Sequence, residues 1–364
     1  MSINPGLQRL DGLWRRGREF LGTRYAILGG AMTWVSERNL VSALSNAGGF
    51  GVLANGAMSP EQLAAEIVAT RALTDRPFGV NLITLHPKLG DLIDVCATQQ
   101  VGYVVLAGGL PPTWAVEQIK AAGAKVLCFA PALVLARKLI RTGVDALIIE
   151  GSEAGGHIGP VATGVLVQEI LPNVDEVPVF VAGGIGRGEA IAMYLEMGAA
   201  GCQLGTRFVC AAESIAHENF KRAFLRAAAR DAVASVQVDP KFPVIPVRAL
   251  ANAATRSFVE FQQQVIGRYH AGEIDQAAAR LEIEHFWAGA LRRAVIDGDV
   301  ETGSLMAGQS VGLVTGIQPV SEIVDELVEQ AVQALTTQAL TTPALATHDP
   351  GGPAGDGPQG GASH

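Results

Sequence analysis

A histidine in a glycine-rich loop is the residue of this chain best suited to chemistry. Residues 150–157 read EGSEAGGH and directly follow an apolar run over residues 146–149. Imidazoles exchange protons near neutral pH, and glycines let the backbone come close to a flat ligand. We therefore expect His157 to be the catalytic residue. Glu150 and Glu153 are the nearest carboxylates, and each could orient the imidazole, line the substrate opening, or be only a solvated or structural charge.

Two further glycine-rich turns predict a phosphate site. Residues 182–188 read AGGIGRG and residues 203–208 read QLGTRF, each directly after an apolar run. In (β/α)8 barrels the loops after the seventh and eighth strands often present backbone N–H groups to a phosphate. We expect a phosphate-bearing cofactor there, held by the amides of Gly183, Gly184 and Gly205 and by the hydroxyl of Thr206. The alternative is that these glycines only make tight turns.

These loops belong to a repeating unit that predicts the fold. A short apolar run, a glycine-rich turn and a helical stretch recur at regular intervals along the chain. The eight runs cover residues 25–28, 51–54, 78–83, 103–107, 125–130, 146–149, 179–182 and 201–204. Such alternation is typical of an α/β fold, and eight units favour a closed (β/α)8 TIM barrel over residues 1–212. A doubly wound open sheet is the alternative.

The pattern changes after the eighth run. Stretches rich in Ala, Arg, Gln and Glu predict helices at residues 213–230, 249–267 and 273–295, so residues 213–318 form a helical cap on the substrate side. Prolines interrupt the cap with a loop over residues 239–246. Residues 319–340 predict a closing helix. Residues 341–364 are rich in Gly, Pro, Ala and Asp, offer few apolar side chains to bury, and predict a disordered tail.

Composition excludes several classes of protein. The net charge is −8 and the sequence pI about 5.4, which speaks against nucleic-acid or membrane-surface partners. No apolar segment approaches the ~20 residues of a membrane span, and the N-terminal residues lack the apolar stretch and cleavage site of a secretory signal, so a cytoplasmic location is expected. The four cysteines lack C-x-x-C spacing and are expected to be reduced core residues. The histidines show no metal-binding spacing, so no metal site is expected.

The motifs resemble the nitronate monooxygenase (2-nitropropane dioxygenase) family of FMN-dependent barrels, which includes enoyl-acyl-carrier-protein reductase II. The resemblance runs from about residue 25 to 314 and rests on segments 29–32, 45–49, 73–81, 153–157, 182–185 and 205–208. It implies FMN over the barrel mouth, contacted by the backbone at Ala31 and Met32 and by the side chain of Asn81. It further implies that Gln203 lies near the flavin, that the phosphate lies at Gly183, Gly184, Gly205 and Thr206, and that His157 is the catalytic histidine.

The resemblance leaves the substrate open. We expect a nitronate monooxygenase, which oxidises alkyl nitronates with O2 to a carbonyl compound and nitrite. The segments at residues 31–35 and 289–309 look like the enoyl reductase branch, which would use NAD(P)H as co-substrate and an acyl thioester as substrate. A quinone reductase and a non-catalytic flavin-binding module are further alternatives. Glu153 and Ser304 are expected on the substrate side, and the family suggests a homodimer.

Overall fold

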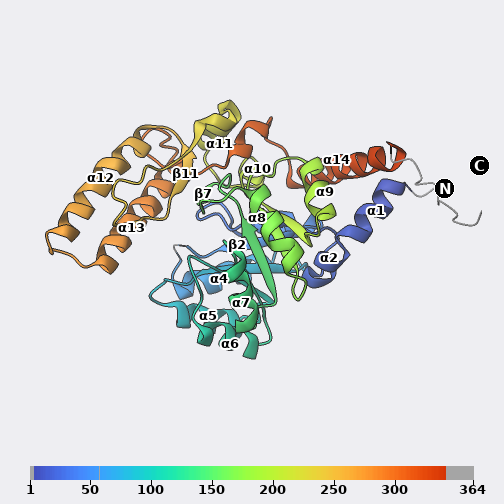
Figure 1. Cartoon of the computed structure of the whole chain (residues 1–364), viewed down its shortest axis with the longest axis horizontal. Helices are drawn as coiled ribbons and strands as arrows, with labels where there is room; N and C mark the ends of the chain where they lie inside the picture. Colours follow the sequence, from blue (N-terminus) through green and yellow to red (C-terminus); the bar gives the residue numbers. More distant parts are fainter. Residues whose placement is uncertain (1–3, 57, 342–364) are drawn as a thin grey trace, which may run out of the picture.

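The computed structural model describes residues 4–56 and 58–341, and its centre is a closed barrel of parallel strands (Figure 1). The barrel order is β1-β2-β3-β4-β5-β6-β8-β9, which confirms the predicted TIM barrel. The strands are β1 (Ile27–Gly29), β2 (Phe50–Ala54), β3 (Phe78–Ile83), β4 (Tyr103–Ala107), β5 (Lys125–Phe129), β6 (Ala146–Glu150), β8 (Val179–Ala182) and β9 (Gly201–Leu204).

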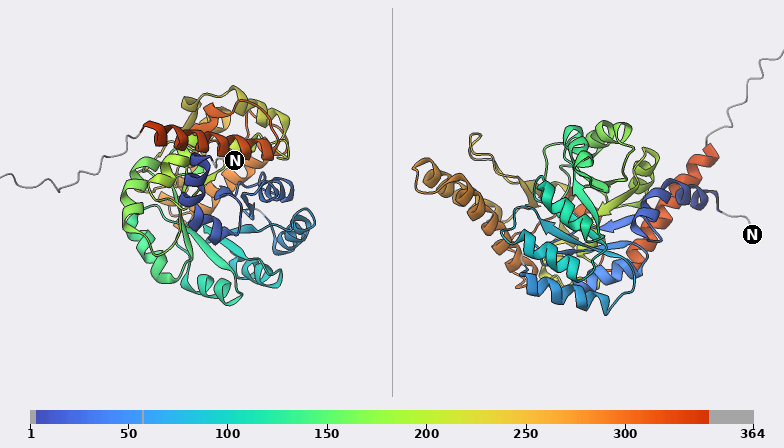
Figure 2. Two further views of the ribbon diagram at one scale, coloured as in Figure 1. Left: turned by 90° about the vertical axis from the view of Figure 1, so that its right-hand side faces the viewer. Right: turned by 90° about the horizontal axis from the view of Figure 1, so that it is seen from below.

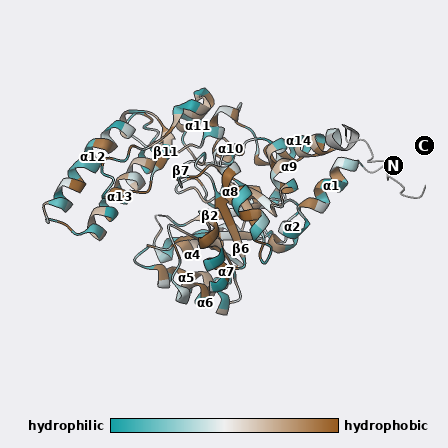
Figure 3. Cartoon of the chain, viewed as in Figure 1, coloured by the Kyte–Doolittle hydropathy of each residue, from teal (hydrophilic) through white to brown (hydrophobic). Residues whose placement is uncertain are grey.

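Helices cover the outside of the barrel, as the repeating unit predicts. They are α3 (Arg38–Asn46), α4 (Pro60–Arg71), α5 (Leu89–Thr98), α6 (Thr113–Ala121), α7 (Leu133–Thr142), α8 (Thr163–Ile170) with η1 (Leu171–Asn173), α9 (Gly188–Glu196) and the short α10 (Thr206–Val209). Most strand residues are buried because both faces of a parallel sheet are covered. Figure 3 accordingly shows β6 in the brown of apolar residues.

Two helices close the amino end of the barrel. Helix α2 (Arg15–Leu21) follows α1 (Pro5–Leu13), and the backbone oxygen of Phe20 accepts hydrogen bonds from Tyr103 and Lys125. Tyr103 and Lys125 are the first residues of β4 and β5, so α2 lies across the ends where these parallel strands begin.

All four cysteines are free and buried, as predicted.

The region after β9 is a cap that combines helices with a small sheet. Helices α11 (Glu218–Arg226), α12 (Ala253–His270) and α13 (Gln276–Val295) confirm three helices, with η2 (Ala229–Asp231) and η3 (Gln309–Leu313) as short turns. The prediction was wrong at residues 249–250, which belong to strand β11 (Val247–Leu250). This strand pairs with β10 (Ala232–Ala234) and with β7 (Gly156–His157). Pairing with a strand from a distant part of the chain overrides the local helical composition.

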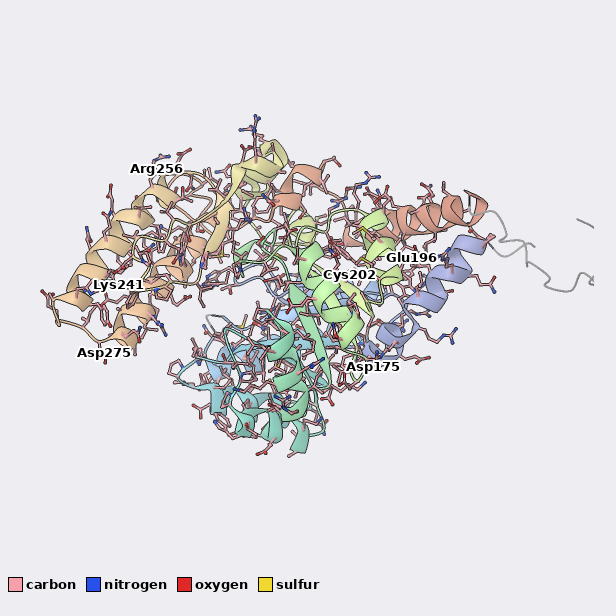
Figure 4. All side chains as sticks on the ribbon, in the orientation of Figure 1. Asp175, Glu196, Cys202, Lys241, Arg256 and Asp275 are labelled. Carbon is pink, nitrogen blue, oxygen red and sulfur yellow. The ribbon has the colours of Figure 1, made fainter. Side chains whose placement is uncertain are left out.

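Helices α12 and α13 form an arm that extends to one side of the barrel (Figures 1 and 2). Figure 4 labels Lys241, Arg256 and Asp275 on this arm. The arm has its own apolar cluster, in which the rings of Phe258 and Trp287 pack in a tilted arrangement with their centroids 4.2 Å apart. The cap is therefore held together by packing of its own as well as by the strand β7 that it shares with the barrel loop.

The closing helix α14 (Val320–Thr341) packs against α1 and α9 on the other side of the barrel (Figure 2). It begins one residue after the predicted start at 319 and runs one residue into the expected tail. The rest of that tail, residues 342–364, lies outside the described residues. Among residues 4–56 and 58–341, no helix combines the length and apolar character needed to cross a membrane.

Candidate active site

The carboxyl ends of the barrel strands bring most of the predicted site residues together. Asn81 on β3 lies opposite Ala54, the last residue of β2. Across the barrel, Glu150 of β6, Ala182 of β8 and Gln203 of β9 are neighbours in register. Asn81 and Gln203 are only 5% and 7% exposed. Active sites of (β/α)8 barrels form at this end, so these polar side chains line the expected mouth.

The turn after β1 lies beside Gln203 and Gly205. A Cβ atom placed on Gly30 would be 3.3 Å from Gln203 Nε2, and one on Gly205 would be 3.5 Å from Met32 Sδ. Ser36 holds the turn, because its Oγ accepts from the Met32 N–H and donates to the Gly30 carbonyl. The structure thus brings Ala31 and Met32 next to the β9 end, where the resemblance predicts cofactor contacts.

The turns after β8 and β9 have the backbone shape and the hydrogen-bond donors of a phosphate site. Gly183 and Gly184 have φ values of 93° and 73°, a region that side chains rarely adopt. A Cβ on Gly183 would also approach the backbone of Gly151 to 3.0 Å. Thr206 Oγ1 accepts a hydrogen bond from the Gly308 N–H at 2.9 Å, which leaves its own proton free to donate. The two turns and Thr206 therefore retain the donors that a phosphate would need.

Unpaired buried groups test whether the mouth fits a flavin. Asn55 follows β2, is 1% exposed, and neither its Oδ1 nor its Nδ2 has a hydrogen-bond partner in the described residues. Thr84 Oγ1, just after β3, is also buried and unpaired. Buried polar groups are nearly always paired, so such atoms indicate a missing partner. The edge of an isoalloxazine ring both donates and accepts hydrogen bonds, and these residues fit it.

His157 lies where the barrel loop meets the cap. As the second residue of β7, it pairs with Val247 of β11, and its side chain is 43% exposed. Its Nε2 is 3.0 Å from Oε2 of Glu284 on α13. The loop is fixed further by Arg248, whose guanidinium donates to the carbonyls of Ser152 and Ala232. The imidazole is thus held on a rigid strand while it stays open to solvent.

The two candidate carboxylates differ in their surroundings. The side chain of Glu150 has no hydrogen bond or ion pair in the described residues, and burial raises the pKa of its carboxyl to about 8. At neutral pH it is mainly protonated and can donate a hydrogen bond. Glu153 is already engaged, because its Oε2 accepts from both the N–H and the hydroxyl of Thr163 at the start of α8. Of the two, Glu150 is the carboxyl that is free to meet a ligand.

The other expected substrate-side residue, Ser304, is fully buried against α13. Its N–H donates to the Ala290 carbonyl at 2.8 Å, and its Oγ has no partner in the described residues. The aromatic residues Phe242 and Trp287 belong to the core of the cap, at 0% and 1% exposure. Trp34 instead lines a cavity of about 310 Å³ between the β1 and β2 turns and the cap residues Ile215, Arg292 and Ile296. A larger hollow of about 650 Å³ lies on α1 and α2, at the amino end.

Asn55, Arg248 and Glu284 were not anticipated from the sequence. Asn55 had a usable signal, because a polar residue directly follows an apolar run at a strand end. Arg248 and Glu284 had none. They lie far beyond the histidine loop in the chain, and only the pairing of β7 with β11 brings the cap to it.

The fold and the site together define an oxidoreductase built on a (β/α)8 barrel, and comparison with known proteins agrees. The sequence profile described as nitronate monooxygenase matches residues 16–100 and 88–330. The chain therefore belongs to the nitronate monooxygenase family, whose members are in general flavin-dependent.

Three similar proteins illustrate the range of that family. FabK from Thermotoga maritima superposes with a TM-score of 0.80 at 35% identity, covering 90% of this chain and 99% of its own. A (3aS,4S,5R,7aS)-5-hydroxy-7a-methyl-1-oxo-octahydro-1H-indene-4-carboxyl-CoA dehydrogenase from Mycobacterium tuberculosis is 32% identical, over 88% of this chain and 96% of its own. A nitronate monooxygenase from Paraburkholderia phytofirmans is 28% identical, over 86% and 94%.

Proposed function

We propose that this protein is an FMN-dependent oxidoreductase that adds or removes hydrogen at a carbon–carbon bond of an acyl thioester. The observation that carries the proposal is the open position of His157, which is 43% exposed at the seam between barrel and cap. A thioester of coenzyme A or of a carrier protein must extend out of the site, and an exposed histidine at this seam is accessible to such a substrate. Similarity to a CoA dehydrogenase and to FabK, an enoyl-acyl-carrier-protein reductase II, supports this substrate class.

The residues of the chain would divide the work between binding and proton transfer. FMN, when bound, would supply hydride transfer to and from carbon. Asn55, Asn81 and Gln203 would hold the ring by hydrogen bonds, and the turns at residues 183–184 and 205–206 would hold the phosphate. His157 would give a proton to the α-carbon of the acyl group in reduction and take it back in oxidation.

Oxidation of a nitronate, the activity that the motifs alone favoured, is the second candidate. The description of the matching family and the Paraburkholderia relative support it. In that reaction His157 would stabilise the nitronate anion or take its α-proton. The substrate is small and would occupy only the inner part of the opening.

Anaerobic stopped-flow spectroscopy of the purified protein separates the two candidates. We expect bound FMN, its reduction by NADH or NADPH, and its reoxidation by crotonyl-CoA. His157→Ala should slow the reoxidation by about 100-fold or more while FMN is retained, because general acid catalysis contributes about 10²–10⁴ in rate. Reduction by propyl-2-nitronate, with nitrite released once oxygen is admitted, would favour the monooxygenase instead. Absence of FMN would overturn both.

We further propose a cytoplasmic location, a small-molecule substrate and a homodimer. Four free, buried cysteines are typical of proteins from a reducing compartment. The negative net charge of −8 gives no support to nucleic-acid binding. The dimer rests on family resemblance alone, and light scattering of the purified protein would test it.

A further inference from the structure

Helix α13 brings one acidic side chain of the cap to the histidine of the barrel. The helix begins at its N-cap Asp275, which Figure 4 shows on the arm, and runs back toward the barrel. Ile283 and Trp287 anchor it in the apolar core of the cap, where both are 1% exposed. Glu284 follows Ile283 on the helix, and its Oε2 lies 3.0 Å from His157 Nε2. The carboxylate is thus presented to the imidazole by a helix whose position is fixed by packing.

Glu284 is the partner that the described residues offer the imidazole. The backbone of His157 pairs with β11, and the next N–H, that of Ile158, donates to the Pro246 carbonyl at 2.9 Å. These bonds fix the main chain and leave the side chain to rotate. Within the described residues the imidazole makes no other ion pair and no hydrogen bond, and Nδ1 is without a partner. The orientation of the ring therefore depends on its contact with Glu284.

We propose that Glu284 is a positioning residue that holds His157 through Nε2, so that Nδ1 exchanges the proton with the substrate. This proposal rests on the proposed function, since it presumes that His157 handles a proton. A carboxylate that accepts from Nε2–H fixes the tautomer and leaves the Nδ1 lone pair free. When Nδ1 takes a proton, the ring becomes positive opposite the negative carboxylate. When Nδ1 returns that proton, the ring is neutral again and Nε2–H has not moved.

The pair contributes little to the stability of the fold, which makes it testable. The side chains of His157 and Glu284 are 43% and 40% exposed, and ion pairs at such positions are weak. Glu284→Gln is therefore expected to fold and to bind FMN as the wild type does. Glu282, two residues earlier on α13, provides a matched control because it pairs with Arg268 at 2.8 Å, on a different side of the helix.

The experiment follows the oxidation of reduced FMN in the full-length holoenzyme. FMN is reduced with dithionite, so that no nicotinamide is needed, and mixed anaerobically with crotonyl-CoA. We expect Glu284→Gln to slow this oxidation by about tenfold, a fraction of the 10²–10⁴ available from general acid catalysis. Glu284→Asp should recover part of the rate, Glu282→Gln should match the wild type, and the dissociation constant for FMN should be unchanged in all three.

A double variant separates positioning from a merely structural effect. In a His157→Ala background, Glu284→Gln should slow the reaction no further, because there is no ring left to hold. A wild-type rate for Glu284→Gln, or an equal slowing in both backgrounds, would overturn the proposal while the thioester function stood. If crotonyl-CoA does not oxidise the wild type but propyl-2-nitronate reduces its flavin, the thioester function fails. In that case the rates of flavin reduction by the nitronate are compared between the wild type and Glu284→Gln, and between His157→Ala and the double variant, and these two ratios decide the role of Glu284. A wild type that reacts with neither probe overturns both.

Discussion

The two ends of the barrel differ in whether the polar groups compared below have hydrogen-bond partners within the protein. At the amino end, the Phe20 carbonyl accepts from Tyr103 Oη at 2.8 Å and from Lys125 Nζ at 2.7 Å. The Lys125 ammonium also lies 4.7 Å from the Phe20 ring centroid and 5.1 Å from that of Tyr103. At the carboxyl end, the Asn55 amide is buried without a partner in the described residues, and Glu150 carries a carboxyl whose pKa burial raises to about 8.

This difference separates residues that stabilise the fold from residues prepared for a ligand. The Phe20 carbonyl and its two donors at the amino end are satisfied by one another, so removal of a donor should affect the free energy of unfolding. The unpaired polar groups at the carboxyl end cost stability until a ligand satisfies them. A (β/α)8 barrel can therefore bind a ligand at its carboxyl end, where polar groups lack partners, while the rest of the barrel keeps the same architecture. Three substitutions test this division.

The largest expected effect is at Glu150. Its folded-state pKa, about 8, lies above the ordinary value of 4.5, so the folded protein holds this proton more tightly than the unfolded chain. Its contribution to stability is therefore fully present below pH 4.5 and is lost as the pH rises toward 8. Glu150→Gln, which is neutral throughout, should be more stable than the wild type at pH 8.5, by on the order of a few kcal/mol. Urea unfolding at pH 5, 7 and 8.5 measures the difference.

Glu189 provides a control of opposite sign. The Arg187 guanidinium lowers the pKa of this exposed carboxyl, so its contribution is present at neutral pH and lost on acidification. Glu189→Gln should therefore lower the stability slightly at neutral pH, and its difference from the wild type should vanish in acid. Parallel pH profiles for the wild type and Glu150→Gln would show that burial does not perturb Glu150, and the contrast between the two barrel ends would weaken.

The sequence was sufficient for the barrel because its signals are local. Each apolar run lies next to a turn and a helix, and strand β3 at Phe78–Ile83 has the predicted bounds. The cap was predicted less well. Residues 247–250 form a strand because β7 and β10, which lie elsewhere in the chain, pair with them. The sequence of these four residues does not indicate either partner.

The candidate site shows the same limit. Gly183, Gly205 and His157 follow strand ends, so their gathering at one edge could be predicted from topology alone. For Glu153 the sequence left a substrate-side and a structural role open, and its carboxylate accepts a hydrogen bond from the Thr163 N–H at the start of α8. Glu284 could not be predicted at all. A contact between an imidazole and a carboxylate so far apart in the chain depends on how the cap packs, and packing has no signature in a single sequence.

A smaller effect, with opposite signs in two states, is expected at Asn55. Asn55→Leu removes a buried amide that has no partner in the described residues, so the apoprotein should be as stable as the wild type or more so. If the amide binds the flavin, the same substitution should weaken FMN binding by about 1–3 kcal/mol. Thermal unfolding of the apoprotein and fluorescence titration with FMN measure the two quantities separately.

Asn81→Leu is the matched comparison for Asn55. The Asn81 Nδ2 donates to the Val105 carbonyl at 3.1 Å, so its loss should destabilise the apoprotein as well as the complex. An Asn55→Leu apoprotein that loses stability to the same extent, with unchanged FMN binding, would place Asn55 among the structural residues instead.

The smallest effect is expected at the amino end, where Lys125→Met removes one donor and one cation. The Phe20 carbonyl keeps its bond from Tyr103, so the loss should be about 1 kcal/mol in the free energy of unfolding, with FMN binding and turnover unchanged. Tyr103→Phe should behave similarly. The double variant leaves the carbonyl without either donor, so its destabilisation should exceed the sum of the two single values. Additive values would mean that water replaces both donors, and a change in turnover would mean that the two ends of the barrel are coupled.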